Sequence, residues 1–266
     1  MHKIRVVITG STRGLGLSLA REFLSRGCGV VISGRQRETT ETVAAGLSTK
    51  FPGSGVRGFP CDVRNPDQVE ALWSSAAGAL GRIDHWINNA GISQATAPIW
   101  ELPTADMEDV VRTDLLGVLY GARAAMRGMA AQGRGTIWFV EGFGSDGRIM
   151  TGLSVYGASK RALRYAAKAL AVEASGTGVR IGTLSPGMMV TDFTITRLER
   201  KDPAAWERTR RVFNILADPP ETVAAFLVPR ILAARKNGTH IAWLTTRKIL
   251  FRFLTAGLTR RRVMPD

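Results

Sequence analysis

The feature that most constrains the fold of this chain is an alternation of short β-branched runs with longer stretches of helical periodicity. Such alternation is typical of a parallel sheet covered by helices on both faces. The strand-like runs cover residues 4–8, 30–33, 56–59, 83–88, 136–140, 179–184 and 239–244, and the helical stretches include residues 14–26, 66–80, 107–131, 154–174 and 221–236. In 266 residues without an internal repeat or a linker, these elements predict one α/β domain over residues 1–244, built on a doubly wound sheet of seven parallel strands.

Two stretches depart from this alternation. Residues 192–216 carry many charges and are expected to form an inserted helical lobe beside the substrate. Residues 245–266 form a basic C-terminal extension; if it is helical, one stripe holds Lys248, Arg252, Thr255 and Thr259, while the large apolar residues fall elsewhere. A packing helix with solvated charges is the favoured interpretation of this stripe, and peripheral contact with an anionic membrane surface is the alternative.

The charge balance of the chain is strongly basic. It holds 36 Lys and Arg against 22 Asp and Glu, a formal net charge of +14, which favours an anionic partner such as a phosphorylated cofactor or an acidic lipid. Nucleic acid is not expected as a partner, because no stacking aromatics interleave with the basic cluster and no recognition-helix motif occurs. His2, His85 and His240 share no metal-ligand spacing, so no metal site is predicted.

The cysteine content and the N-terminal sequence bear on where the protein is located. Cys28 and Cys61 cannot form a disulfide framework in a chain of this size, which favours a reducing compartment. No apolar run is long enough to span a bilayer, and a strand-like run that begins at residue 4 leaves no room for a signal or transit peptide. We expect a cytoplasmic protein, or a chain whose leader has been removed, with any membrane contact peripheral and at the inner face.

A glycine-rich turn joins the first predicted strand to the first predicted helix. Its residues are Gly10, Ser11, Thr12, Arg13, Gly14, Leu15 and Gly16. Glycines allow a tight turn and a close approach to a pyrophosphate, which the free N–H groups at the start of the helix then bind. The spacing differs from the G-x-G-x-x-G fingerprint, but its place between a strand and a helix favours a dinucleotide site over a simple tight turn.

The end of the second predicted strand indicates which dinucleotide binds. An acidic residue at this place is typical of NAD sites, whereas an arginine accommodates the additional phosphate of NADP. The sequence has Arg35 here and no carboxylate, and Arg13 in the glycine turn adds a second cation. Guanidinium groups bind phosphate in a bidentate way, so NADP(H) is the predicted cofactor; the alternative is that both are ordinary surface arginines.

Tyr156 and Lys160 lie near the start of the predicted helix over residues 154–174. A spacing of four residues places both side chains on one face of a helix. A neighbouring ammonium group lowers the pKa of a phenol, which makes the tyrosine usable as a general acid towards a carbonyl oxygen. Alone, such a pair is typical of an ordinary solvated helix face; the glycine turn about 140 residues upstream favours a functional pair instead.

The sequence resembles the short-chain dehydrogenases/reductases over residues 3 to about 244. The resemblance rests on the glycine turn at residues 9–16, Asp62, residues 88–91, the pair of Tyr156 and Lys160, and Pro186-Gly187. The resemblance implies a Rossmann-type sheet, a nicotinamide cofactor, and a homodimer or homotetramer. It implies that Tyr156 donates or accepts the proton, and that Lys160 holds the nicotinamide ribose and lowers the pKa of the tyrosine. The further cofactor contacts that it implies are Asp62 and Val63 at the adenine, Asn89, Ala90 and Gly91 along the cofactor, and Pro186, Gly187, Met189 and Thr191 at the nicotinamide.

Two positions differ from the usual pattern of that family. Counting back from Tyr156 over the usual spacing to the catalytic serine leads to Phe143, and Ser145 is the nearest hydroxyl. The supporting asparagine is replaced by Asp114, which resembles it in shape and keeps a backbone carbonyl for a relay water. We therefore expect Ser145 and Asp114 to complete the catalytic group.

The segment over residues 141–148, Glu-Gly-Phe-Gly-Ser-Asp-Gly-Arg, resembles the stretch that replaces the usual serines in chlorophyll(ide) b reductases. Further matches follow at residues 156–160, 184–188, 213–219, 227–229 and 252–255. This resemblance implies reduction of a formyl group on a bulky apolar molecule such as a chlorin pigment, in a pocket lined by Phe143, Met188, Met189 and Phe193. The alternatives are an unrelated carbonyl substrate, or an NADP(H)-binding sensor or scaffold without catalysis.

Overall fold

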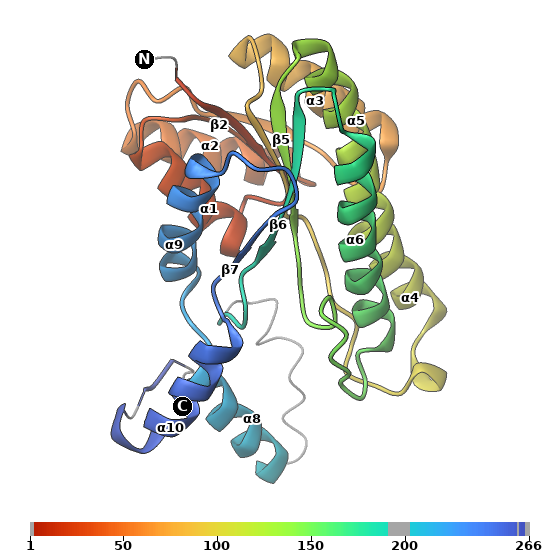
Figure 1. The fold of residues 1–266 in the computed structure, drawn as a ribbon, viewed down its shortest axis with the longest axis vertical. Coiled ribbons are helices and arrows are strands. Elements are labelled where there is room, and N and C mark those ends of the chain that lie inside the picture. The colour runs from red at the N-terminus through yellow and green to blue at the C-terminus, as the bar shows by residue number, and fades with distance from the viewer. Residues whose placement is uncertain (1–2, 191–202, 260, 264–266) are drawn as a thin grey trace.

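The computed structural model describes residues 3–190, 203–259 and 261–263 (Figure 1). Within them, seven parallel strands form one sheet in the order β3-β2-β1-β4-β5-β6-β7. The strands are β1 Arg5–Ile8, β2 Gly29–Gly34, β3 Arg57–Pro60, β4 His85–Asn88, β5 Gly135–Val140, β6 Val179–Ser185 and β7 Thr239–Ala242. The predicted α/β class and doubly wound parallel sheet are confirmed. The winding reverses between β1 and β4, and sheets of this kind bind ligands beyond the carboxyl ends of the strands at that point.

Helices cover both faces of the sheet (Figure 1). One face carries α1 Gly14–Ser25, α2 Arg37–Lys50 and α9 Pro220–Ala233, and the other carries α3 Pro66–Leu80, α5 Gly117–Gln132 and α6 Ser154–Glu173. Residues of β1 pack alternately into the two layers, Val6 and Ile8 against the first and Val7 against the second. A strand buried on both sides is expected to be apolar where it is covered, as Val6, Val7 and Ile8 are; Arg5, at the start of β1, is only partly buried.

Several element boundaries differ from the sequence prediction. The helix predicted over residues 107–131 begins earlier, as α4 Thr104–Val110, and passes through the π-helical turn η2 Val111–Leu116 before α5. The 3-10 turn η1 Ile99–Glu101 and helix α2 were not among the predicted elements; α2 buries only Thr40 and Leu47, so its apolar periodicity is weak. Strands β4 and β7 are shorter than predicted.

Two further helices lie beyond the carboxyl end of the sheet. Helix α8 Pro203–Leu216 occupies the later part of the predicted lobe, whose beginning lies outside the described residues, and α10 Thr246–Thr259 makes the C-terminal extension helical. The two helices contact each other, away from the main body of the molecule (Figure 1). In the part of the chain that is described, no helix is long and apolar enough to cross a membrane.

Both cysteines are buried free thiols, one before β2 and one after β3. Burial raises the pKa of Cys28 to about 11 and the pKa of Cys61 to about 12. Neither thiol is therefore ionised at neutral pH, and both act as small apolar side chains of the core.

Candidate active site

Tyr156 and Lys160 lie one helical turn apart at the start of α6, and both side chains are buried. The ammonium nitrogen of Lys160 is 5.5 Å from the centre of the Tyr156 ring. A Cβ atom built on Gly91 would lie 3.4 Å from Lys160 Nζ, so the lysine reaches the segment after β4. The next residue back, Ala90, closely approaches Gly10, which brings the pair beside the glycine turn.

The ammonium group of Lys160 has a buried anionic partner. Its Nζ atom lies 2.9 Å from Asp114 Oδ2, and Asp114 Oδ1 accepts a hydrogen bond of 2.7 Å from the backbone N–H of Ile92. Burial alone acts to lower the pKa of Lys160, but the charge of Asp114, the neighbouring Tyr156 and the hydrogen bond to Asp114 together raise it above its usual value. The lysine is therefore cationic at neutral pH. Asp114 is provided by the π-helical turn η2, a feature often found at functional sites.

Gly142, two residues beyond the end of β5, packs against the Tyr156 hydroxyl. A Cβ atom built on Gly142 would overlap Tyr156 Oη and would lie 3.1 Å from Lys160 Cε. Any side chain at this position would displace the hydroxyl. Counting along the sequence directed attention to Phe143 and Ser145 instead, and the importance of Gly142 was missed because it depends on the path of the loop after β5.

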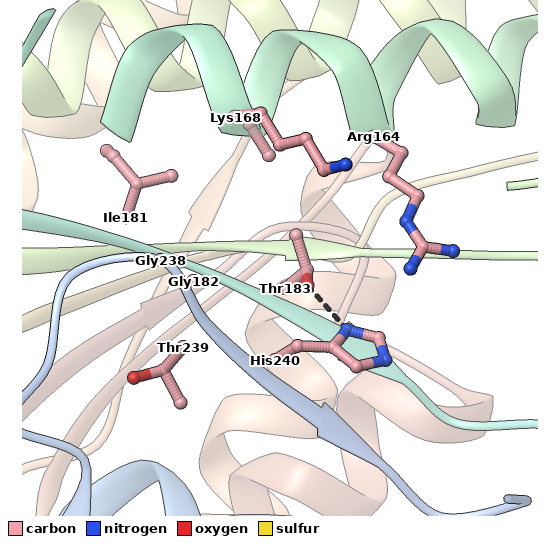
Figure 2. Close-up of a pocket in the computed structure, with 9 residues that line it drawn as sticks. Arg164, Lys168, Ile181, Gly182, Thr183, Gly238, Thr239 and His240 are labelled. Carbon is pink, nitrogen blue, oxygen red and sulfur yellow. Dashed lines mark hydrogen bonds between the residues drawn. The ribbon is translucent and has the colours of Figure 1, made fainter. Parts of the chain in front are cut away.

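The Ser145 hydroxyl is buried and donates a hydrogen bond of 3.3 Å to Glu141 Oε2. The other oxygen of this buried carboxylate lies 3.7 Å from Arg164 Nε and 3.9 Å from His240 Nδ1. His240 in turn is 2.7 Å from the Thr183 hydroxyl, and these two side chains border a shallow pocket beneath Arg164 on α6 (Figure 2). The structure thus brings Ser145 together with Glu141, a residue to which sequence reasoning had given no individual role.

The glycine turn has the geometry that dinucleotide binding requires. Gly10 and Gly14 have φ of 60° and 55°, in the left-handed region that favours glycine. A Cβ atom on Gly16 would lie 2.6 Å from Asn89 Nδ2. That amide donates to the carbonyls of Thr9 and Gly10, at 2.9 Å each, which fixes the segment after β4 against the turn. The glycines therefore keep the backbone open at the carboxyl end of β1.

The start of α1 is suited to a phosphate group. The side chain of Arg13, at the N-cap, makes no capping hydrogen bond within the described residues, and the first turn of α1 contains no acidic residue. Unsatisfied N–H groups at a helix start bind anions. Arg13 and Arg35 are both exposed, and Ser11 links the ends of the strands by accepting a 2.9 Å hydrogen bond from the N–H of Ser33. Together with the glycine cradle, these residues fit a phosphorylated dinucleotide.

The other predicted cofactor contacts follow neighbouring strands. Asp62 and Val63 come after β3. Asp62 forms an ion pair with Arg64, in which Asp62 Oδ2 lies 2.7 Å from Arg64 Nη2. The hydrogen bond from Arg64 is the main cause that lowers the pKa of Asp62, which therefore stays ionised. Pro186 and Gly187 come directly after β6. Thr12, Leu15, Asn89, Ala90 and Gly91 all lie in the turn or in the segment packed against it.

The predicted pocket residues are only partly described. Phe143, Met188 and Met189 are half-buried in the loops after β5 and β6. The backbone carbonyl of Met188 accepts a 3.1 Å hydrogen bond from the N–H of Asp218. Thr191 and Phe193 lie outside the described residues, so their predicted roles at the nicotinamide and the substrate stay predictions.

Comparison with known proteins agrees with this architecture. A family model for the short chain dehydrogenases matches residues 5–202. A chlorophyll(ide) b reductase of Arabidopsis thaliana is 39% identical over 249 residues, which cover 90% of this chain and 70% of that protein. A probable chlorophyll(ide) b reductase of the same plant is 35% identical over 277 residues, or 98% of this chain and 54% of that protein, so the chain spans about half the length of this relative.

A solved structure supports the fold independently. The 3-ketoacyl-(acyl-carrier-protein) reductase from Brucella melitensis, complexed with NADH, superposes with a TM-score of 0.78 over 92% of this chain and 98% of that chain, at 22% identity. The chain belongs to the short-chain dehydrogenase/reductase family, a class of NAD(P)-dependent oxidoreductases. The predicted family and Rossmann-type fold are thereby confirmed.

Proposed function

We propose that this protein uses NADPH to reduce a carbonyl group, and that its substrate is a formyl group on a bulky apolar molecule of the chlorophyll(ide) b type. The observation that carries the reductase proposal is the buried group of Tyr156, Lys160 and Asp114 beside the glycine turn. When bound, the cofactor supplies hydride to the carbonyl carbon. The chain supplies a proton for the oxygen and binding sites for the phosphates.

Tyr156 donates its hydroxyl proton to the carbonyl oxygen as negative charge develops there. Lys160 stabilises the tyrosinate left behind, because an adjacent cation favours the charged form of a phenol. Asp114 keeps Lys160 protonated and fixed in position. Gly142 leaves the space in which the hydroxyl lies, and in this proposal Tyr156 alone donates a side-chain hydrogen bond to the substrate oxygen.

The cofactor preference rests on the two exposed arginines. Arg13 and Arg35 provide cations at the glycine turn and after β2, where an NAD-preferring site would carry a carboxylate. The turn and the start of α1 bind the pyrophosphate. The implied contacts of Asp62, Asn89 and their neighbours with the remainder of the cofactor are part of the same proposal.

The substrate class rests on two observations. Phe143 and Met188 offer apolar surface at the carboxyl end of the sheet, and two similar plant proteins carry the name chlorophyll(ide) b reductase. The predicted cytoplasmic location and the predicted homodimer or homotetramer stay predictions.

An NADP(H)-binding sensor is the second candidate function. It is favoured by the absence of a side chain at Gly142 and by the engagement of the Ser145 hydroxyl with Glu141. Such a protein would bind NADPH with measurable affinity and oxidise it with no carbonyl compound.

NADPH oxidation with chlorophyllide b, and with a panel of other aldehydes and ketones, separates these functions. We expect turnover with the formyl pigment, lost by at least about a thousandfold in Tyr156→Phe because no other acid replaces the phenol, with NADPH affinity retained. Tyr165→Phe is the matched control, since Tyr165 is exposed on the same helix. Full activity of Tyr156→Phe contradicts the mechanism, whereas turnover only with other carbonyls contradicts the substrate class alone.

A further inference from the structure

Helix α10 is oriented with its apolar side outwards. Leu250, Phe251, Leu254 and Leu258 follow the spacing of one helix face and are 59%, 65%, 83% and 86% exposed. We call these four residues the outer stripe. A surface helix normally turns such a face towards the core and its charges towards water, and here the arrangement is reversed.

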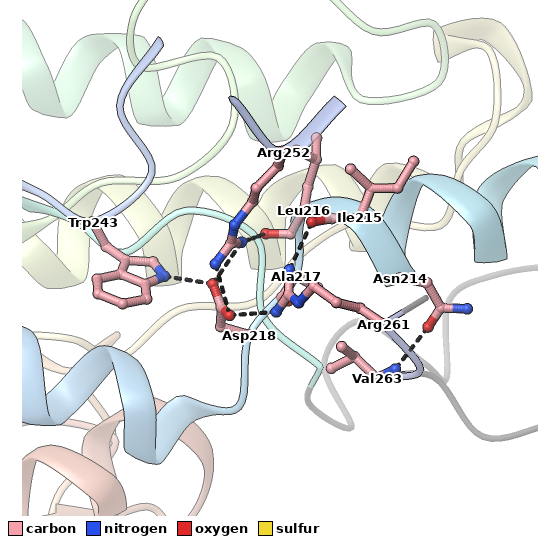
Figure 3. Close-up of polar contacts among 9 residues, drawn as sticks. All are labelled: Asn214, Ile215, Leu216, Ala217, Asp218, Trp243, Arg252, Arg261 and Val263. Atoms are coloured by element: carbon pink, nitrogen blue, oxygen red, sulfur yellow. Dashed lines mark hydrogen bonds and ion pairs between the residues drawn. The ribbon is translucent and has the colours of Figure 1, made fainter. Parts of the chain in front are cut away.

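The opposite side of α10 is held inwards by a buried carboxylate (Figure 3). Asp218 Oδ2 lies 2.8 Å from Arg252 Nη1 and accepts a 2.6 Å hydrogen bond from Trp243 Nε1. Its Oδ1 atom lies 2.6 Å from Arg261 Nη2. Burial acts to raise the pKa of Asp218, but the hydrogen bonds from Arg252 and Trp243 and the two positive charges outweigh it and keep the pKa low. We call these four residues the Asp218 cluster.

The Asp218 cluster fixes the rotation of the helix. Turning α10 to bury the outer stripe would expose Arg252 and take one of its two arginine partners from the buried carboxylate of Asp218, which is unfavourable. Lys248, on the same inner side, is stacked on the Trp243 ring at 2.8 Å from its centre. The two cations of the stripe that was predicted to carry solvated charges, Lys248 and Arg252, thus face inwards in the structure, and the exposed apolar surface is maintained by specific contacts.

Exposed arginines lie on α10, just after it and on the neighbouring helix α8. Arg247 is exposed on α10, Arg262 is exposed just after it, and the neighbouring α8 exposes Arg208 and Arg211. The exposed acid on α8 within the described residues, Glu207, is paired with Arg210. An apolar stripe flanked by arginines is the pattern of helices that lie in the interface of an anionic membrane.

From this arrangement we infer that α10 is a docking helix for a membrane surface rich in anionic phospholipid, with the outer stripe inserted among the acyl chains and the arginines at the headgroups. A second copy of the chain fits less well, because the exposed arginines of α10 and α8 would repel their counterparts across such an interface. The inference does not depend on the proposed reductase function.

Co-sedimentation of the full chain with vesicles tests the inference. We expect binding to phosphatidylcholine vesicles that contain phosphatidylglycerol, weaker binding to phosphatidylcholine alone, and release at high salt. The double substitution Leu254→Glu with Leu258→Glu should reduce binding at least about tenfold. Both positions are exposed, so the fold is preserved, and circular dichroism and NADPH affinity verify this.

The matched control is Tyr165→Glu with Val172→Glu, which changes two similarly exposed apolar residues on α6; it should bind vesicles as the unchanged chain does. Failure of the unchanged chain to bind anionic vesicles overturns the inference, as does equal loss in the control. If the outer-stripe variant instead turns a dimer into a monomer on a sizing column while vesicle binding is unaffected, the stripe is an interface between copies and the inference is wrong.

Discussion

The carboxylate of Asp114 lies 2.9 Å from the ammonium group of Lys160, although the π-helical turn η2 and helix α6 are far apart in the sequence. Both side chains are buried, so each charge depends on the other for stabilisation in place of water. The lysine that the proposed mechanism requires is therefore a member of an ion pair, and its charge state is controlled by Asp114.

Asp114→Asn should make Lys160 deprotonate at lower pH. The amide keeps an oxygen that accepts the hydrogen bond from the Ile92 N–H, but it removes the negative charge that raises the pKa of Lys160. Without that charge, burial lowers the pKa of Lys160. We expect the alkaline limb of the kcat/KM profile to move down by about one to three pH units. Asp109→Asn, at an exposed ion pair with Arg64, should leave the profile unchanged; an unchanged profile in Asp114→Asn would refute the role of the pair.

The same substitution affects stability. Because the pKa of Lys160 is raised in the folded state, the pair stabilises the fold in full below the unfolded-state pKa of about 10.4, and this stability is lost only as the pH rises through the folded-state pKa. At pH 7, urea unfolding should show Asp114→Asn less stable by about 3 kcal/mol or more. A variant as stable as the unchanged chain would show that the ion pair contributes nothing to the free energy of unfolding.

Gly142→Ser should reduce turnover although it adds a hydroxyl group next to the phenol of Tyr156. The Cβ atom would overlap Tyr156 Oη, so the phenol must move from its place beside Lys160. We expect kcat to fall by at least about tenfold, which corresponds to about 1.4 kcal/mol of transition-state stabilisation, with NADPH affinity little changed. Gly78→Ser, at an open helical position, is the control. An increase in kcat would show that the hydroxyl is useful and the crowding harmless.

Arg35→Asp should shift the cofactor preference from NADPH to NADH. The substitution replaces a cation with the carboxylate that holds ribose hydroxyls at NAD sites. Loss of one charge-assisted contact predicts a rise of about tenfold or more in the KM for NADPH, with a lower KM for NADH. Arg21→Asp, an equal charge change at an exposed position of α1, should alter neither. Equal KM values in Arg35→Asp and the unchanged chain would refute the assignment of Arg35.

His85 should make the fold sensitive to mild acid. Burial lowers its pKa to about 4, and its Nδ1 atom accepts a 3.2 Å hydrogen bond from Trp138 Nε1, which requires the neutral ring. The stability gained by keeping the ring neutral is therefore present above about pH 6.5 and is lost as the pH falls towards 4. Between pH 7 and pH 5, the free energy of unfolding should drop by about 2 kcal/mol. His85→Asn should remove this drop, and His240→Asn, at a more exposed position, should retain it. The same pH dependence of stability in the unchanged chain and in both variants would refute the assignment of the drop to His85.

The fold was predictable from local signals where those signals were strong. Helix α3 was predicted at its observed bounds, because Asn65 caps its start, Pro66 opens it and Gly81 ends it in a left-handed conformation. Helix α2 has no comparable apolar face and was not singled out. The division of the helix over residues 107–131 by a π-helical turn depends on the packing around Asp114, which a periodic pattern does not record.

Some features of the candidate site were likewise predictable from local sequence, and others were not. The proximity of Tyr156 and Lys160 was predictable from the sequence because both lie on one turn of one helix. The ion pair of Lys160 with Asp114, the contact of Tyr156 with Gly142 and the hydrogen bond of Ser145 to Glu141 all depend on how distant segments or a loop are folded. The inward direction of Arg252 depends on Asp218, in another part of the chain, so the sequence alone favoured the opposite orientation of α10.

The burial of Cys28 and Cys61 has a practical consequence. Thiolates are the reactive species towards maleimide reagents, and neither of these thiols is exposed or ionised near neutral pH. A single cysteine introduced on the surface, for example by Leu258→Cys, would therefore take up a fluorescent label selectively, without removal of the native pair. A polarity-sensitive dye at that position would test the proposed insertion of α10 among acyl chains, because its emission colour shifts in apolar surroundings.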